Sequence, residues 1–243
     1  SLLPESLSAA DGWRLAAVCK PAREVGGDFF AELPGRNDGE HVVIYGDVSG
    51  KSISGALMMM AAHEVLNSVA LAHPEPENLL RLANERLYAL RGNRERTGIQ
   101  GGSFVALGYL GFRAGSGAFS YTLAGQPPPM LRRSSGSVEC LEMPDHRLPL
   151  GAMRVGGHQM IERELEIGDL IVAYSDGVVE AQSPTGDFFG EERLALSLAD
   201  APADPQGAVN FLLEEIEAFT CGHTPYDDVT LLAASWSAND KSA

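Results

Sequence analysis

The chain has 243 residues, of which 44% are hydrophobic and 21% are charged, a balance typical of one globular domain that needs no disulfide or structural metal for stability. Its 33 acidic residues outnumber its 18 lysines and arginines, giving a formal charge of −15. This excess argues against nucleic acid and against an anionic membrane surface as main partners, since both need clustered cations. Three widely spaced cysteines favour a reduced, cytoplasmic protein. We expect no membrane insertion, because no apolar run approaches the roughly 20 residues of a span.

The order of predicted elements is irregular. Strands are expected at 13–20, 27–33 and 41–47, then helices from Gly55 to the prolines at 74 and 76 and from 79 to 90. Further strands are expected at 103–110, 118–123, 130–133, 161–167 and 170–174, helices at 191–198 and 206–219, and a last strand at 229–236. Because strands and helices do not alternate regularly, the order predicts α+β layers rather than a doubly wound sheet.

Two segments carry a prediction of which side chains face the core. Steps of three and four along the first helix predict a buried stripe formed by Ala56, Met59, Met60, His63, Leu66 and Ala70. Alternation over 161–167 predicts a half-exposed strand, with glutamates on one side and Ile161, Leu165 and Ile167 on the other.

A nucleotide-binding loop is one interpretation of the segment that joins a strand to the first helix. Gly50-Lys51-Ser52 lies at this junction, as in a P-loop. That motif requires four residues between its first glycine and Gly-Lys, whereas three separate Gly46 from Gly50. The spacing disfavours the P-loop.

Aspartates at strand ends offer a second interpretation. Asp28 follows a glycine pair, Asp47 ends an apolar strand, Asp176 follows another, and Asp227-Asp228 precede the last strand. Each one alone fits an ordinary turn aspartate. Four such positions together favour a site for a hard divalent cation, because short acidic side chains on flexible backbone suit oxygen coordination.

Seven segments containing these residues resemble the PPM, or type 2C, metal-dependent protein serine/threonine phosphatases, and within them the bacterial SpoIIE-like and RsbU-like branch. The segments are PAREVGGDFFAEL (21–33), GDVSGKSISGALMM (46–59), AGQPPPML (124–131), LPLGAM (148–153), GDLIVAYSDGVVEAQ (168–182), FGEERL (189–194) and DDVTLLAA (227–234). The chain departs from the usual pattern at Gln126, where the family commonly has histidine, at Ser175, where threonine is more usual, and at Ser52, where glycine often follows the lysine. These departures leave the substrate contacts open.

The resemblance implies a four-layer α-β-β-α fold, with a central antiparallel β-sandwich flanked by helices. It also implies two Mn²⁺ or Mg²⁺ ions that activate water for attack on phosphorus. Asp28 would hold one ion, Asp47 both, beside the Val48 carbonyl, and Asp176 and Asp227 the other. Asp228 is either the supporting neighbour or the direct ligand. The implied catalytic residues are Asp28, Asp47, Asp176 and Asp227, and Arg23 and Lys51 are candidate phosphate contacts.

The function implied by the resemblance is hydrolysis of phosphoserine or phosphothreonine on a partner protein, an anti-sigma-factor antagonist, in stress-response signalling by sigma-factor regulation. Residues 1–12 would end a linker from an upstream sensor or receiver domain, 13–236 would form the phosphatase domain, and 237–243 a tail. Family members can dimerise. The alternative is a catalytically silent domain of the same fold that binds its partner, which intact aspartates at all four strand ends disfavour.

Overall fold

The computed structural model describes residues 7–8, 11–23, 26–37, 39–49, 53–96, 104–154, 156–223 and 226–238. Two five-stranded sheets form its centre. The first has the order β1-β10-β9-β6-β7, with β1 Trp13–Lys20, β10 Val229–Trp236, β9 Leu170–Tyr174, β6 Met130–Arg132 and β7 Val138–Cys140. The second has the order β2-β3-β4-β5-β8, with β2 Phe29–Leu33, β3 Glu40–Val48, β4 Val105–Arg113, β5 Ala118–Ala124 and β8 Ile161–Glu164. Neighbouring strands in both sheets are antiparallel.

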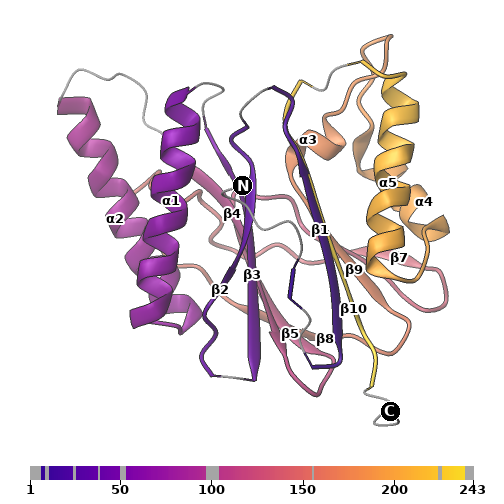
Figure 1. Ribbon diagram of the computed structural model, residues 1–243, viewed down its shortest axis with the longest axis horizontal. Helices are drawn as coiled ribbons and strands as arrows, with labels where there is room; N and C mark the ends of the chain where they lie inside the picture. The colour runs from indigo at the N-terminus through magenta and orange to yellow at the C-terminus, as the bar shows by residue number, and fades with distance from the viewer. Residues whose placement is uncertain are drawn as a thin grey trace.

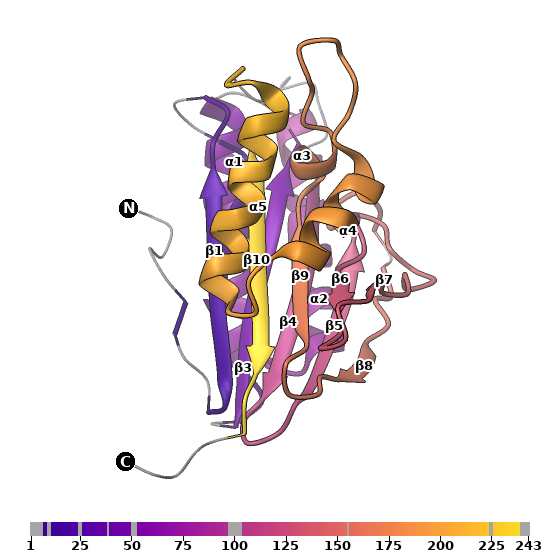
Figure 2. The same cartoon turned by 90° about the vertical axis from the view of Figure 1, so that its right-hand side faces the viewer.

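Helices cover the outer faces of both sheets. The pair α1 (Ile53–Ala72) and α2 (Pro76–Arg96) lies against the second sheet, and α4 (Gly190–Asp200) and α5 (Pro205–Thr220) lie against the first, as Figures 1 and 2 show. Three apolar clusters fill the two helix–sheet interfaces and the space between the sheets. This α-β-β-α architecture confirms the fold class expected from the sequence.

The buried face of α1 differs from the expected stripe. Leu66 and Ala70 are buried as predicted, but Met60 is 45% exposed. Met58, Ala62 and Val69 complete the buried face instead. Apolar residues occur nearly all around this helix, so the spacing alone did not fix which side meets the sheet.

Short elements account for the other differences from the predicted order. The three-residue strand β7 and the four-residue helix α3 (Asp176–Val179) were not expected. Strand β8 ends at Glu164, and Ile167 is 61% exposed rather than inward-facing. The alternating pattern continues beyond the last paired residue, so it extended the predicted strand too far.

Helix α1 is long and apolar enough to cross a membrane, judged by its length and composition alone. Gly55–Ala72 is the one such stretch found in the described residues. It is interrupted by His63, Glu64 and Asn67, so it is not an unbroken apolar run. Here the helix packs against α2, β2 and β3, and Met58, Ala62 and Leu66 belong to the cluster between the helix pair and the sheet. Its apolar composition therefore serves the core of this domain.

The segment 148–154, which contains the LPLGAM motif, is tied to α2 and β4. Leu150 and Val105 exchange two backbone hydrogen bonds, of 2.8 and 2.9 Å. The buried side chain of Asn84 in α2 accepts from Gly151 N at 2.9 Å and donates to Met153 O at 3.1 Å. The segment is therefore held against the start of β4, beside the end of β3.

Candidate active site

The predicted site residues come together at one end of the sandwich. Asp28 directly precedes β2, Asp47 and Val48 end β3, Asp176 opens α3 after β9, and Asp227-Asp228 precede β10. In Figure 1 the ends of β3 and β9 lie at the same, upper edge of the two sheets.

Antiparallel pairing explains this convergence. The start of one strand lies beside the end of its antiparallel neighbour. Phe29 at the start of β2 accordingly pairs with Gly46 near the end of β3, and Leu231 near the start of β10 pairs with Tyr174 at the end of β9. Residues that flank these strands at the shared edge therefore become neighbours.

Gly27 makes the close contact between the β1–β2 connection and the end of β3. Its carbonyl accepts a hydrogen bond from Val48 N at 3.2 Å. A Cβ at this position would lie 2.8 Å from Val48 O and 3.1 Å from Asp47 Oδ1. Because glycine has no side chain, there is room beside it for two oxygen atoms of β3, Val48 O and Asp47 Oδ1.

A second glycine brings the two acidic segments of the first sheet together. A Cβ on Gly177 would overlap the carbonyl of Asp228 and lie 3.4 Å from Asp227 Cβ. The Asp176-Gly177 turn therefore packs directly on the Asp227-Asp228 pair.

The aspartates share one electrostatic environment. Burial raises the pKa of Asp47 and, together with the negative charges of Asp176, Asp227 and Asp228, brings it to about 6. Asp28 and Asp228 are buried, Asp47 and Asp227 are half-buried, and Asp176 is exposed. The cluster is open to solvent on the side of Asp176.

Asp28 forms the buried end of this cluster. Burial raises its pKa well above the ordinary value, and the charges of Asp47 and Asp228 act in the same direction, while a hydrogen bond from Thr230 opposes them. Thr230 Oγ1 donates to Asp28 Oδ2 at 2.6 Å. Thr230 was not predicted as a site residue. It is the one polar residue in the otherwise apolar run VTLLAA, which could have marked it as a partner of a buried polar group.

The side chain of Asp228 is already engaged with the backbone. Its Oδ1 accepts from Ala22 N at 2.7 Å, and its Oδ2 accepts from Gly27 N at 2.6 Å and Asp28 N at 3.2 Å. Both carboxylate oxygens are therefore used on the connection between β1 and β2.

The arrangement and the chemistry of these residues decide whether they fit divalent cations. Among the described residues, no three Asp, Glu, His or Cys side chains already adopt the arrangement of a finished metal site. The donor set nevertheless fits Mg²⁺ or Mn²⁺, because it consists of carboxylates and a carbonyl, the ligands these ions prefer. The charges that raise the pKa of Asp47 come from neighbouring aspartates, so a bound cation would be attracted to this position. Asp47 Oδ1 and Val48 O both lie close to Gly27, within 3.1 Å of where its Cβ would be.

The structure describes one of the two candidate phosphate contacts, Arg23. Arg23 is exposed, one residue after Ala22, on the connection that Asp228 holds. Lys51 lies outside the described residues, as does the rest of the Gly50-Lys51-Ser52 segment. The antiparallel sandwich itself argues against the P-loop interpretation, since that loop follows a strand of a parallel sheet.

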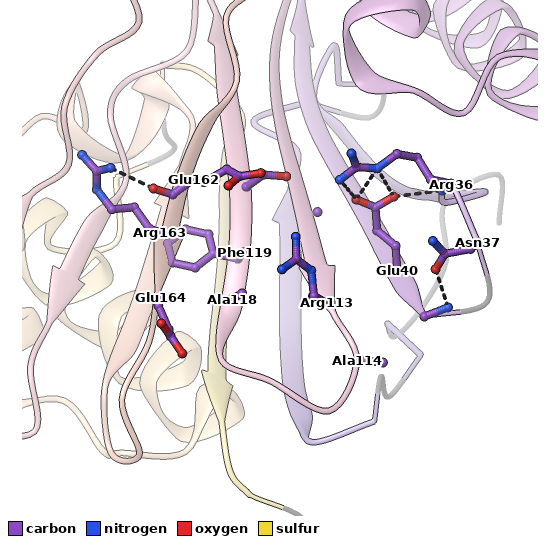
Figure 3. A pocket seen from close by; sticks show the side chains of 13 residues that line it. Arg36, Asn37, Glu40, Arg113, Ala114, Ala118, Phe119, Glu162, Arg163 and Glu164 are labelled. Atoms are coloured by element: carbon purple, nitrogen blue, oxygen red, sulfur yellow. Dashed lines mark hydrogen bonds and ion pairs between the residues drawn. The ribbon is translucent and has the colours of Figure 1, made fainter.

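A cavity of about 810 Å³ lies at the opposite end of the second sheet, where β3 begins and β4 ends. Figure 3 shows Arg36 paired with Glu40 on one side, at 2.8 Å, and Arg163 on the other. None of the clustered aspartates lines this cavity. It is therefore separate from the candidate active site.

Comparison with known proteins agrees with this fold. The solved structures that resemble the chain are PPM phosphatases, so the architecture is the PPM phosphatase fold. The SiaA PP2C domain of Pseudomonas aeruginosa has a TM-score of 0.77 and 19% identity, covering 92% of this chain and 86% of that one. The RsbU and RsbW domains of a Mycobacterium tuberculosis protein have a TM-score of 0.74 and 26% identity, covering 98% and 63%.

The family model described as "Stage II sporulation protein E (SpoIIE)" matches residues 37–237. The chain belongs to the SpoIIE family, as its motifs predicted. It is 23% identical to the phosphoserine phosphatase RsbU of Bacillus subtilis over 187 residues, which cover 76% of this chain and 52% of that protein. It is 26% identical to protein IcfG of Synechocystis over 253 residues, which cover 96% of this chain and 39% of that protein. The chain therefore spans about half, or less, of these curated relatives.

Proposed function

We propose that this chain is a Mn²⁺- or Mg²⁺-dependent protein serine/threonine phosphatase. The observation that supports it is the convergence of five aspartates, from four strand ends, in one electrostatic cluster of a PPM fold. In this proposal Asp28, Asp47, Asp176 and Asp227, with the Val48 carbonyl, hold two cations. The charges of Asp176 and Asp227 raise the pKa of Asp47, and the charge of Asp47 raises that of Asp28, so Asp47 is near both groups of acids.

The cations would supply Lewis acidity toward water and the phosphoryl oxygens. The chain's own residues provide the rest of the site. The exposed side of the cluster, at Asp176, leaves it open to a phosphorylated side chain of another protein. Asp47, Asp176 and Asp227 would repel a phosphate dianion on their own, so the carboxylates are arranged to be neutralised before substrate binds. Arg23, and Lys51 beyond the described residues, are the proposed contacts to phosphate.

The proposed substrate is a phosphoserine or phosphothreonine on an anti-sigma-factor antagonist in bacterial signalling. It is supported by similarity to RsbU, named a phosphoserine phosphatase, and by membership of the SpoIIE family. Because the chain spans only part of these relatives, we also propose an upstream sensor or receiver domain in the whole protein. A cytoplasmic location is supported by three free cysteines, Cys19, Cys140 and Cys221.

Phosphate release with added Mn²⁺ tests the proposal, using an aryl phosphate and a phosphoserine protein as substrates. We expect turnover that a chelator abolishes and that Asp47→Asn and Asp176→Asn each reduce at least 100-fold, since each removes a negative charge and an oxygen donor from the site. Turnover that persists in both variants would contradict the assignment. Metal binding without turnover on any substrate would support the alternative, a catalytically silent domain.

A further inference from the structure

Asp228 has an unusual set of partners for a residue beside a metal centre. Its two oxygens accept three hydrogen bonds, all from backbone N–H groups and all from one connection of the chain, between Ala22 and Asp28. The side chain is buried, at 7% exposure. Three N–H donors compensate a buried carboxylate in the way that an anion is held by main-chain amides.

The connection that Asp228 holds crosses from one sheet to the other. It begins after β1, which pairs with β10 in the first sheet, and ends at β2, which pairs with β3 in the second. Asp228 lies at the start of β10, so it fixes the connection to the first sheet. Gly27 then fixes it to the second, through its contact with Val48.

The fit around the carboxylate is tight. A Cβ on Gly26 would overlap Asp228 Oδ2, and the neighbouring Gly27 N donates to the same oxygen. The next residue is Asp28, whose own N–H completes the set. The position of the Asp28 backbone is thus set by Asp228, and the orientation of its carboxylate by Thr230.

We propose that Asp228 is a positioning residue and not a metal ligand: its carboxylate straps the β1–β2 connection so that Asp28 and Gly27 lie against Asp47 and Val48. The role of these hydrogen bonds in building a metal site rests on the proposed function. The hydrogen bonds themselves, which we call the strap, are present in the metal-free chain. Asp227 is then the ligand of the pair.

Amide hydrogen exchange of the metal-free protein, measured by NMR, tests the strap directly. In Asp228→Asn, one acceptor oxygen becomes a donor, so we expect exchange at Ala22, or at Gly27 and Asp28, to accelerate on the order of tenfold or more. Asp227→Asn is the matched control. It keeps an oxygen that can accept from Asp228 N, as Asp227 Oδ1 does at 3.1 Å, and should leave these three amides as in the wild type.

Gly26→Ala provides a second variant that changes no carboxylate. Its methyl group would displace the Asp228 side chain, so all three amides should exchange faster. Unchanged exchange in both Asp228→Asn and Gly26→Ala, with the native fold retained, would overturn the strap.

Calorimetric titration with Mn²⁺ separates positioning from ligation. We expect Asp228→Asn to keep the wild-type stoichiometry with an affinity weakened on the order of 10–100-fold, and Asp227→Asn to lose one bound ion. Loss of an ion in Asp228→Asn, with unchanged amide exchange, would make Asp228 the ligand and contradict the proposal. If the wild type bound no Mn²⁺, the proposed function would fail, while the exchange measurements would still decide whether the strap exists.

Discussion

At the scale of single residues, the hydroxyl of Thr230 is directed at a carboxylate that solvent barely reaches. Thr230 is 1% exposed and Asp28 is 4% exposed, and the hydrogen bond between them is 2.6 Å long. A hydrogen bond to a buried charged or strongly polar group is costly to lose because water does not replace it. Thr230 therefore stabilises the buried carboxyl group of Asp28, although it is not one of the proposed metal ligands.

Replacing Thr230 with valine tests this contact. Thr230→Val keeps the shape and removes the donor, so we expect the free energy of unfolding to fall by about 1–3 kcal/mol. Thr230→Ser retains the hydroxyl and should lose clearly less. Urea denaturation of the metal-free proteins measures both, and equal losses in the two variants would show that the methyl group, not the hydrogen bond, is what stabilises.

The pKa of Asp47 predicts a pH dependence of stability. Its value of about 6 in the folded protein lies above the ordinary 3.8, so the folded state binds this proton more tightly than the unfolded state does. The contribution to stability is then present below about pH 4 and is lost as the pH rises to about 6, by about 1–3 kcal/mol.

Comparison with Asp47→Asn isolates that contribution, since other groups titrate in the same range. Urea unfolding of both metal-free proteins between pH 4 and 7 should show the wild type losing stability relative to the variant as the pH rises. A difference between the two that is independent of pH would contradict the raised pKa.

At the scale of elements, the orientation of α1 decides which apolar residues support the site. Leu66 is fully buried against the sheet, whereas Leu57 on the same helix is 57% exposed. We expect Leu66→Ala to lower the free energy of unfolding by about 2–5 kcal/mol, because it leaves a cavity. Leu57→Ala should change it by less than about 0.5 kcal/mol. Chemical denaturation measures both, and similar losses would mean that α1 packs with a different face.

The strand ends are the other feature at this scale. Asp28 and Asp47 were each predicted as site residues from their positions at strand ends, and antiparallel pairing of β2 with β3 places the two strand ends side by side. The stripe on α1 was predicted only in part, since Leu66 and Ala70 are buried but Met60 is 45% exposed. A strand end is marked by a local change in composition. Which face of a helix is buried, when the helix is apolar on most sides, depends on the sheet that it packs against.

At the scale of the whole molecule, the formal charge is −15. Part of the resulting repulsion between negative side chains occurs within the aspartate cluster. A ligand that binds only the folded state raises stability by about 2.7 kcal/mol when present at 100 times its dissociation constant. We therefore expect Mn²⁺ at such a concentration to raise the unfolding temperature of the wild type and to have much less effect on Asp47→Asn.

Glu192→Gln is the control for general charge neutralisation, because Glu192 is an exposed acid on α4 outside the cluster. It should respond to Mn²⁺ as the wild type does. Thermal unfolding with and without the ion measures all three proteins. An equal shift in Asp47→Asn would show that the ion acts elsewhere on the acidic surface.

The sequence by itself determined the family, the α+β layers and the four strand ends at which acids occur, because motifs, composition changes and glycine-flanked aspartates are local features of the chain. Only the tertiary structure decided what Asp228 contacts: Gly27, its partner through Oδ2, lies 201 positions away. Local pattern carries no information about which of two adjacent aspartates turns toward a distant backbone. That choice is made when two sheets pack face to face and the connection between them needs an acceptor for its amides.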